Sequence, residues 1–301
     1  MEGNTSEGRV GVARIGHVVL RVEDLDRAVN FYRDVLSLDE TERGGGRSFL
    51  TCNERHHELI LVESPKRGYE QLAIEYPDEH ALETVLERVG ATGGERLGPI
   101  TDEPSIGPAE LVRAPGGHLF KLFTGMEIGA TPQAPVDGVR PSRFEHISLK
   151  LRKMAPIEHF LTEGLGFRFS DRLGSMASWW HCEAEHHGVA VQRAPANHLH
   201  HHAWTFSDLN ALGTVADRLH ARGQTLTWGP GRHGPGNNHF IYFRDPSGAL
   251  LESCSEIRRF DDVEHPYEPR RWPFRPISIS LWGGVMPPSF LSAGVPAAGG
   301  R

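Results

Sequence analysis

The feature that most constrains the fold is an internal duplication, because the second half of this 301-residue chain repeats the pattern of the first. Residues 15–38 (IGHVVLRVEDLDRAVNFYRDVLSL) align with residues 144–167 (FEHISLKLRKMAPIEHFLTEGLGF), and each segment predicts a short strand followed by an amphipathic helix. In this alignment His17 corresponds to His146. Two further pairs follow at nearly the same offset, 71–82 with 201–212 and 113–121 with 244–252. The two halves are therefore expected to share one architecture.

Each half is itself double. A second strand-and-helix pattern begins at Gln71 in the first half and at His201 in the second, at almost equal separations from His17 and His146. A strand with one helix cannot bury its own sheet face, so units of this kind must pair. We expect an α+β protein of four βαβββ modules, paired into two domains with curved mixed sheets.

The loop at 129–143 (GATPQAPVDGVRPSR) is rich in Pro, Gly and Ala and predicts the boundary between the domains. Residues 1–135 are interpreted as an N-terminal domain without a metal site, and residues 136–260 as the catalytic, metal-binding domain. Residues 261–301 form a Pro- and Arg-rich extension without a clear period. We expect this extension to wrap the second domain.

Three corresponding positions in the two halves differ in chemistry. In the second half they are His146, His201 and Glu252, and in the first half they are His17, Gln71 and Lys121. Two imidazoles and one carboxylate form a set that suits Fe(II) and leaves coordination positions open. A protonated lysine offers no lone pair and repels a cation. The second half is therefore predicted to hold the metal and the first half to be a scaffold copy.

The run HLHHHAW leaves open which histidine is the ligand. Counting from His201, apolar residues fall at alternate positions, as they do after His17. Counting from His202 would place Thr205 and Ser207 at these apolar positions, so His201 is preferred.

Charge and composition exclude several classes of partner. The net charge is −7, and no block of basic residues stands out, so a nucleic-acid partner is not expected. The glycine-rich stretch 229–236 lacks the GK[ST] ending of a phosphate-binding loop. No run approaches the roughly 18 apolar residues of a membrane helix, and residues 1–16 lack the pattern of a signal peptide. Three scattered cysteines argue against a disulfide framework. We expect a cytoplasmic protein that does not bind membranes.

At this point the motifs resemble type I extradiol catechol dioxygenases of the vicinal oxygen chelate superfamily, and homoprotocatechuate 2,3-dioxygenases most of all. The resemblance covers residues 10–260 and is most specific over 229–252 (GPGRHGPGNNHFIYFRDPSGALLE). There the GPGRHG motif, a Tyr in an aromatic strand, a DPxG turn and the ligand Glu follow at the family's spacing. The motif HHGVAV places His187 ahead of His201, also at the family's spacing.

The resemblance implies a role for each matching residue. His146, His201 and Glu252 would bind Fe(II), or Mn(II) with the same ligands. His187 would act as acid/base catalyst, and His233 and Tyr242 would hydrogen-bond the catechol oxygens. The substrate pocket would also include Trp179, Arg232 and Asn237. The substrates would be a small catechol and O2, and a homo-oligomer is implied.

Two other functions stay open. The same fold and ligand pattern serve glyoxalase-like or epimerase-like lyases and isomerases, which use a redox-inert metal. A metal-free sequestering protein of the bleomycin-resistance type would use a similar cleft. The His187, His233 and Tyr242 set favours ring cleavage, which would give a muconic semialdehyde. The sequence does not identify which catechol is cleaved.

Overall fold

The first half of the chain forms two successive modules of a strand, a helix and three strands. The structure is a computed structural model that describes residues 13–135, 137–264 and 266–298, so the outer ends of the predicted N-terminal domain and of the extension lie outside it. The elements of this half are β1 (Arg14–Val22), α1 (Leu25–Leu36), β2 (Asp39–Gly44), β3 (Arg47–Thr51), β4 (Leu59–Glu63), β5 (Gly68–Tyr76), α2 (Glu79–Val89), β6 (Glu95–Pro99), β7 (Ala109–Arg113) and β8 (Leu119–Thr124).

The second half repeats this order and is followed by a loosely structured extension. Its modules comprise β9 (Arg143–Leu151), α3 (Met154–His159) with the π-helical turn η1 (Phe160–Gly164), β10 (Arg168–Leu173), β11 (Ala177–His181), β12 (Val189–Arg193), β13 (His198–Phe206), α4 (Leu209–Ala221), β14 (Trp228–Arg232), β15 (His239–Arg244) and β16 (Leu250–Ser255). The extension holds β17 (Arg270–Trp272), α5 (Pro276–Ile279), α6 (Pro288–Leu291) and β18 (Val295–Pro296).

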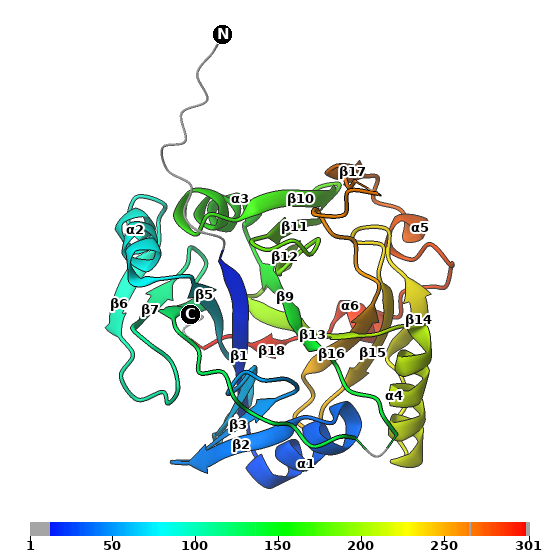
Figure 1. The fold of residues 1–301 in the computed structure, drawn as a ribbon. Helices are drawn as coiled ribbons and strands as arrows, with labels where there is room; N and C mark the ends of the chain where they lie inside the picture. Colours follow the sequence, from blue (N-terminus) through cyan, green and yellow to red (C-terminus); the bar gives the residue numbers. More distant parts are fainter. Residues whose placement is uncertain (1–12, 136, 265, 299–301) are drawn as a thin grey trace.

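Each half builds one mixed sheet, as Figure 1 shows. The strand order is β2-β3-β4-β1-β5-β8-β7-β6 in the first sheet and β14-β15-β16-β13-β9-β12-β11-β10-β17 in the second. In both sheets the two central strands are antiparallel, and each has a parallel neighbour on its outer side. The predicted α+β class with four βαβββ modules and mixed sheets is confirmed.

The strand register places the corresponding positions side by side. Ala203 on β13 lies opposite both His146 on β9 and Glu252 on β16. His201 precedes Ala203 by two residues and therefore points to the same face of the sheet. The three expected ligands thus come from three adjacent strands and share one face.

Three of the four module helices begin at an aspartate N-cap. The carboxylates of Asp24, Asp78 and Asp208 accept hydrogen bonds from backbone N–H groups in the first turns of α1, α2 and α4. The third module has Lys153 at this position, without a capping hydrogen bond, and its helix continues into η1. Among the described residues no helix is both long enough and apolar enough to cross a membrane.

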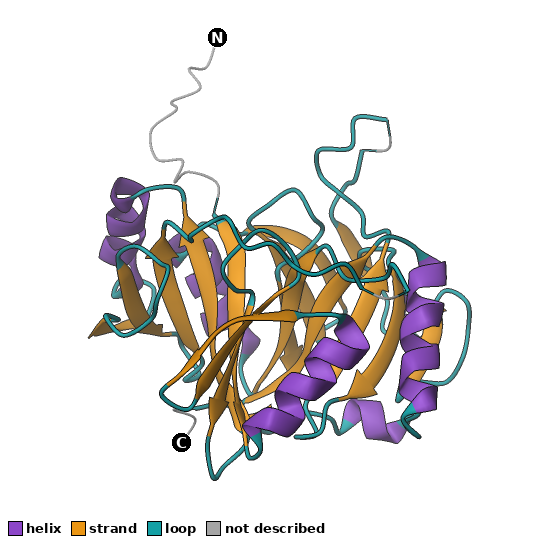
Figure 2. Cartoon of the chain, turned by 60° about the horizontal axis from the view of Figure 1, so that its bottom comes forward, coloured by secondary structure: helices purple, strands orange, loops and turns teal. Residues whose placement is uncertain are grey.

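The two halves share one hydrophobic core, because helices of one half pack against the other. Figure 2 shows the strands in the middle of the molecule with helices at its sides. Helix α1 contacts α4, and α2 contacts η1. The ring of Phe31 on α1 lies 6.3 Å from that of Phe243 on β15.

A buried hydrogen-bond chain also joins the halves. Trp204 Nε1 donates to His202 Nδ1 (3.1 Å), so the remaining ring proton of a neutral His202 is on Nε2, 3.2 Å from the Tyr32 hydroxyl. The Tyr32 hydroxyl in turn donates to Asp245 Oδ2 (3.0 Å). The chain runs from α1 of the first half to β13 and the β15–β16 turn of the second.

The substitution Tyr32→Phe is expected to lower the free energy of unfolding by about 1–3 kcal/mol, because it leaves buried polar groups of His202 and Asp245 without a partner. Urea denaturation would measure this loss. Tyr69→Phe is the matched control: Tyr69 is equally buried, but its hydroxyl makes one long hydrogen bond to a carbonyl (3.3 Å), so a smaller loss is expected. Equal effects of the two variants would show that the chain through Tyr32 does not stabilise the contact between the halves.

Candidate active site

The three predicted ligands converge on one point in the second half. The Nε2 atoms of His146 and His201 are 3.3 Å apart, and each lies 3.3 Å from Glu252 Oε2. The centre of such a triangle is about 1.9 Å (the side divided by √3) from each atom, close to the ~2.0–2.2 Å of metal–nitrogen and metal–oxygen bonds. All three side chains are nearly fully buried. The residues present therefore fit a divalent cation.

The surroundings of His146 favour positive charge. His146 Nδ1 lies 2.9 Å from Glu145 Oε2, and Glu145 is buried with it. Burial disfavours the imidazolium form, yet the hydrogen bonds to Glu145 and Glu252 raise the pKa of His146 to about 9. The Glu145 contact also directs the Nδ1 proton outward and leaves Nε2 free as a ligand atom. A divalent cation would supply the charge that these two carboxylates favour.

His201 is oriented by its neighbour His200. His200 Nε2 lies 2.8 Å from the carbonyl oxygen of Phe290, which can only accept, so the His200 proton is on Nε2. His200 Nδ1 must then accept from His201 Nδ1, 2.8 Å away. This arrangement leaves the lone pair of His201 Nε2 directed to the metal position.

Glu252 is held by two donors. Asn238 Nδ2 donates to Oε1 (2.9 Å), and the Tyr242 hydroxyl donates to Oε2 (2.7 Å). Burial and the Glu252 carboxylate raise the pKa of Tyr242, so the phenol stays protonated. His233 Nε2 lies 2.9 Å from the Tyr242 oxygen, while His233 Nδ1 donates to the carbonyl of Ile279 (2.7 Å).

His187 stands beside the candidate metal position and does not belong to the group of converging ligand atoms. Its ring centroid is 4.2 Å from that of His146. His187 Nδ1 lies 3.0 Å from His186 Nδ1, and His186 Nε2 lies 3.2 Å from the Asp171 carboxylate. The nearby carboxylate favours a proton on His186 Nε2 by charge alone, since the two atoms make no hydrogen bond. With this tautomer His187 Nδ1 donates to His186, and His187 Nε2 keeps a free lone pair. Burial and the nearby His146 lower the pKa of His187, which keeps the ring neutral.

A cavity of about 250 Å³ opens on these residues. His146, His201, Glu252, His187, His233 and Tyr242 all line it. Its outer wall is mostly apolar and includes Trp179 on β11 and, from the extension, Phe274, Met286 and Phe290. The extension therefore forms part of the cavity wall.

The comparison with known families decides the classification. The model of the Glyoxalase/Bleomycin resistance protein/Dioxygenase superfamily matches residues 14–122 and 143–253, once for each half. The chain belongs to this superfamily. The match to both halves also confirms the duplication and the family resemblance predicted from the sequence.

Individual members of the superfamily agree with this. A manganese-dependent 2,3-dihydroxybiphenyl 1,2-dioxygenase from Geobacillus genomosp. 3 is 28% identical, over 87% of this chain and 90% of that protein. Metapyrocatechases are among the other curated relatives. The Mn(II)-bound glyoxalase from Novosphingobium aromaticivorans has a TM-score of 0.85 at 26% identity, covering 94% of this chain and 96% of its own. Homoprotocatechuate 2,3-dioxygenase from Arthrobacter globiformis has the same fold, with a TM-score of 0.85 at 23% identity, covering 96% and 93%.

Two residues that the sequence placed in the substrate pocket, Arg232 and Asn237, do not line the cavity. Arg232 Nε donates to the backbone oxygen of Asn237, and Arg232 Nη2 pairs with Glu256. Neighbouring residues of an extended segment point to opposite sides, so the inward position of His233 directs Arg232 outward. Asn237 sits in a turn at φ 54°, and the next residue, Asn238, reaches Glu252 instead.

Three positioning residues were not predicted from the sequence. Glu145, His200 and Asn238 each hydrogen-bond a metal-ligand candidate. Glu145 and His200 are the chain neighbours of His146 and His201, which is the one signal that the sequence offered. Asn238 was missed because the doublet at 237–238 does not tell which amide faces inward.

The substitution His200→Ala is expected to weaken metal binding about 10–100-fold, because it removes the group that fixes the tautomer of His201. Activity should return when metal is added in excess, which loss of folding would not allow. Metal affinity by competition with a chelator would measure the effect. His198→Ala is the control, since His198 lies on the same strand, is partly exposed and does not contact His201. An unchanged affinity in His200→Ala would contradict the orienting role.

Proposed function

We propose that this protein is an extradiol dioxygenase that cleaves the ring of a catechol beside its two hydroxyls, giving a product of the muconic semialdehyde type. Its cofactor is Fe(II), with Mn(II) as the alternative, bound by His146, His201 and Glu252. The observation that carries the proposal is the triangle of 3.3 Å between these three ligand atoms, open to a cavity that also contains a neutral, unliganded His187. The curated relatives named above are ring-cleaving dioxygenases, in agreement with the predicted class of oxidoreductase.

When bound, a redox-active divalent cation brings catechol and O2 together and lets electrons pass between them. The protein supplies binding and proton transfer. Tyr242 and His233 both line the cavity beside Glu252 and can hydrogen-bond the catechol oxygens. The free Nε2 of His187 can accept a proton from a catechol hydroxyl and return it to an oxygen atom later in the reaction. The apolar wall with Trp179 accommodates the ring and excludes water.

The decisive experiment uses protein freed of metal and reloaded without oxygen with either Fe(II) or Mn(II). Catechols with apolar and with acidic substituents are then added together with O2. The expected result is uptake of one O2 per ring cleaved and a yellow product. If neither metal form consumed O2 with any catechol, the proposal would fail. The more active metal form identifies the cofactor.

A second candidate is a metal-dependent lyase or isomerase, favoured by the glyoxalase of known structure that shares this fold. Such an enzyme works with a redox-inert metal and without O2. Protein loaded with Mn(II) or with Zn(II) and assayed anaerobically with a glyoxalase substrate separates the two: the dioxygenase is expected to be inactive with either metal there. A homo-oligomer and a cytoplasmic location stay predictions from the sequence.

A further inference from the structure

The first half holds a buried cluster that corresponds to the active site. His17 on β1 occupies the place of His146, and His57 occupies the place that His187 has in the second half. The neighbouring pairs match as well, because His56 Nδ1 lies 2.9 Å from His57 Nδ1, as His186 Nδ1 does from His187 Nδ1 at 3.0 Å. The cluster therefore has counterparts of two imidazoles of the active site, those of His146 and His187.

The charged groups of this cluster differ from those of the active site. Lys121 on β8 lies opposite Ala73, as Glu252 lies opposite Ala203, so an ammonium replaces the ligand carboxylate. The carboxylate comes instead from Glu103, in the loop between β6 and β7, at the position that corresponds to His233. The sequence predicted the loss of the ligand at Lys121 but not the arrival of Glu103.

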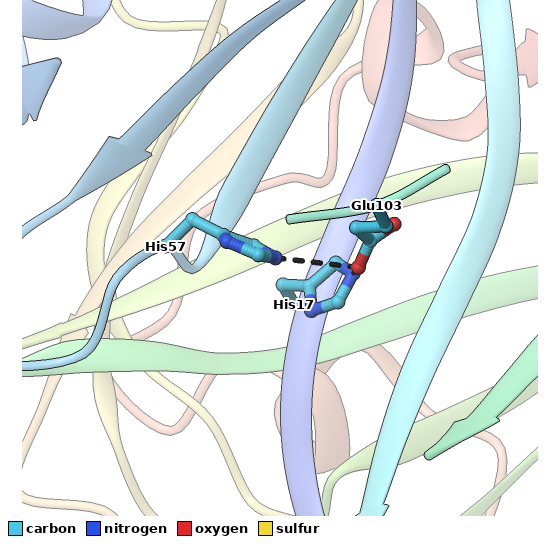
Figure 3. A group of neighbouring side chains, drawn as sticks. All are labelled: His17, His57 and Glu103. Atoms are coloured by element: carbon cyan, nitrogen blue, oxygen red, sulfur yellow. Dashed lines mark ion pairs between the residues drawn. The ribbon is translucent and has the colours of Figure 1, made fainter. Parts of the chain in front are cut away.

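The three possible ligands of the cluster converge as those of the active site do. Glu103 Oε1 lies 3.1 Å from His17 Nε2 and 3.4 Å from His57 Nε2. Figure 3 shows the three side chains next to one another. One ligand atom from each of the three residues lies within 4.8 Å of the others. His17 and His57 are completely buried, and the Glu103 side chain is 4% exposed. The donor set, two imidazoles and one carboxylate, is the same as in the active site.

The Lys121 ammonium lies against this group. Lys121 Nζ is 3.1 Å from His17 Nε2 and forms an ion pair with Glu103 Oε2. An ammonium and a carboxylate neutralise each other in the interior, where an isolated charge is strongly unfavourable.

The ammonium does not satisfy the whole cluster. His57 Nε2 and Glu103 Oε1 are buried and make no hydrogen bond to any residue that the structure describes. The two atoms lie 3.4 Å apart, and Glu103 Oε2 forms the ion pair with Lys121. A single metal ion would use the lone pairs of all three residues, whereas Lys121 contacts only two of them.

We infer that the first half retains a divalent-metal site formed by His17, His57 and Glu103, and that the ammonium of Lys121 fills this site in place of a metal ion. The protein therefore binds one metal per chain, at the active site, although it contains two sets of ligands. The first half is more than a scaffold copy, because it contains a metal site that the side chain of Lys121 closes.

The substitution Lys121→Met tests this inference, because methionine keeps most of the apolar stem and is one atom shorter, leaving the place of Nζ free. After loading with Co(II) and removal of excess metal, the wild type is expected to hold one ion per chain and Lys121→Met two. The double variant Lys121→Met/Glu103→Gln should return to one. Lys121→Met that is folded by circular dichroism yet holds one ion would overturn the inference.

A second measurement does not depend on the folding of Lys121→Met. In a chain whose active site is disabled by His201→Ala and Glu252→Ala, Lys121 is intact and no Co(II) should bind. If this chain bound one Co(II), and His17→Ala abolished the binding, Lys121 would not close the site and the inference would fall. Both measurements count metal ions and need no substrate, so they are independent of the proposed ring cleavage.

Discussion

Replacing Glu252 by glutamine is expected to abolish metal binding at micromolar metal and to reduce ring cleavage by at least about a thousandfold. Glu252 is the one anionic group among the three candidate ligands, and its carboxylate also accepts hydrogen bonds from Asn238 and Tyr242. The amide keeps the shape but removes the only negative charge among the three candidate ligands. Loss of a direct ligand exceeds the roughly 10–100-fold effects of groups that only orient ligands. Metal content by elemental analysis and O2 uptake would measure the two losses together.

Glu256→Gln is the matched control for this substitution. Glu256 follows Glu252 by four residues, is half exposed and pairs with Arg232 outside the cavity. It should keep one metal ion per chain and its activity. Full activity in Glu252→Gln, or equal losses in both variants, would show that Glu252 is not a ligand.

Replacing His187 by asparagine is expected to lower kcat by about 10²–10⁴-fold while the metal content stays at one ion per chain. His187 lies beside His146 but does not belong to the triangle of candidate ligand atoms, so under the proposed function it serves proton transfer and not metal binding. Its free Nε2 depends on the hydrogen bond to His186 and, through His186, on Asp171. Steady-state kinetics on metal-loaded protein would separate this effect on kcat from an effect on binding.

The first half of the duplicated chain supplies a matched control for His187→Asn as well. His57 is the corresponding residue of the first half, equally buried and next to a histidine in the same way. His57→Asn is expected to leave kcat close to that of the wild type. If His187→Asn lost its metal, or if both variants lost activity equally, the assignment of His187 as acid/base catalyst would be wrong.

The fold was predictable because its information is local and repeated. Alternating apolar residues specify strands, amphipathic segments specify helices, and an aspartate at positions 24, 78 and 208 begins three of those helices. The internal repeat then predicted that the four strand-and-helix modules pair in the same way in each half. The candidate ligands followed from the same register, since residues at matching positions of adjacent strands must lie side by side.

Residues in loops could not be placed in this way. The segment 233–238 turns back through a positive φ at Asn237, so its alternation does not continue the pattern of β14. The family resemblance placed His233, Arg232 and Asn237 in the pocket; the structure turns His233 inward, and Asn238 reaches Glu252 in place of Asn237. Glu103, likewise in a loop, reaches His17 from a distant part of the first half.

The sequence by itself determined the four modules, their pairing and the convergence of the three candidate ligands, because each depends on a short-range period and on strand register. Only the tertiary structure decided how the active-site histidines are held. The carbonyls of Ile279 and Phe290 fix the rings of His233 and His200, and both belong to an extension without any periodic pattern. A backbone carbonyl is the same in every residue, so no choice of side chain marks where it will accept a hydrogen bond.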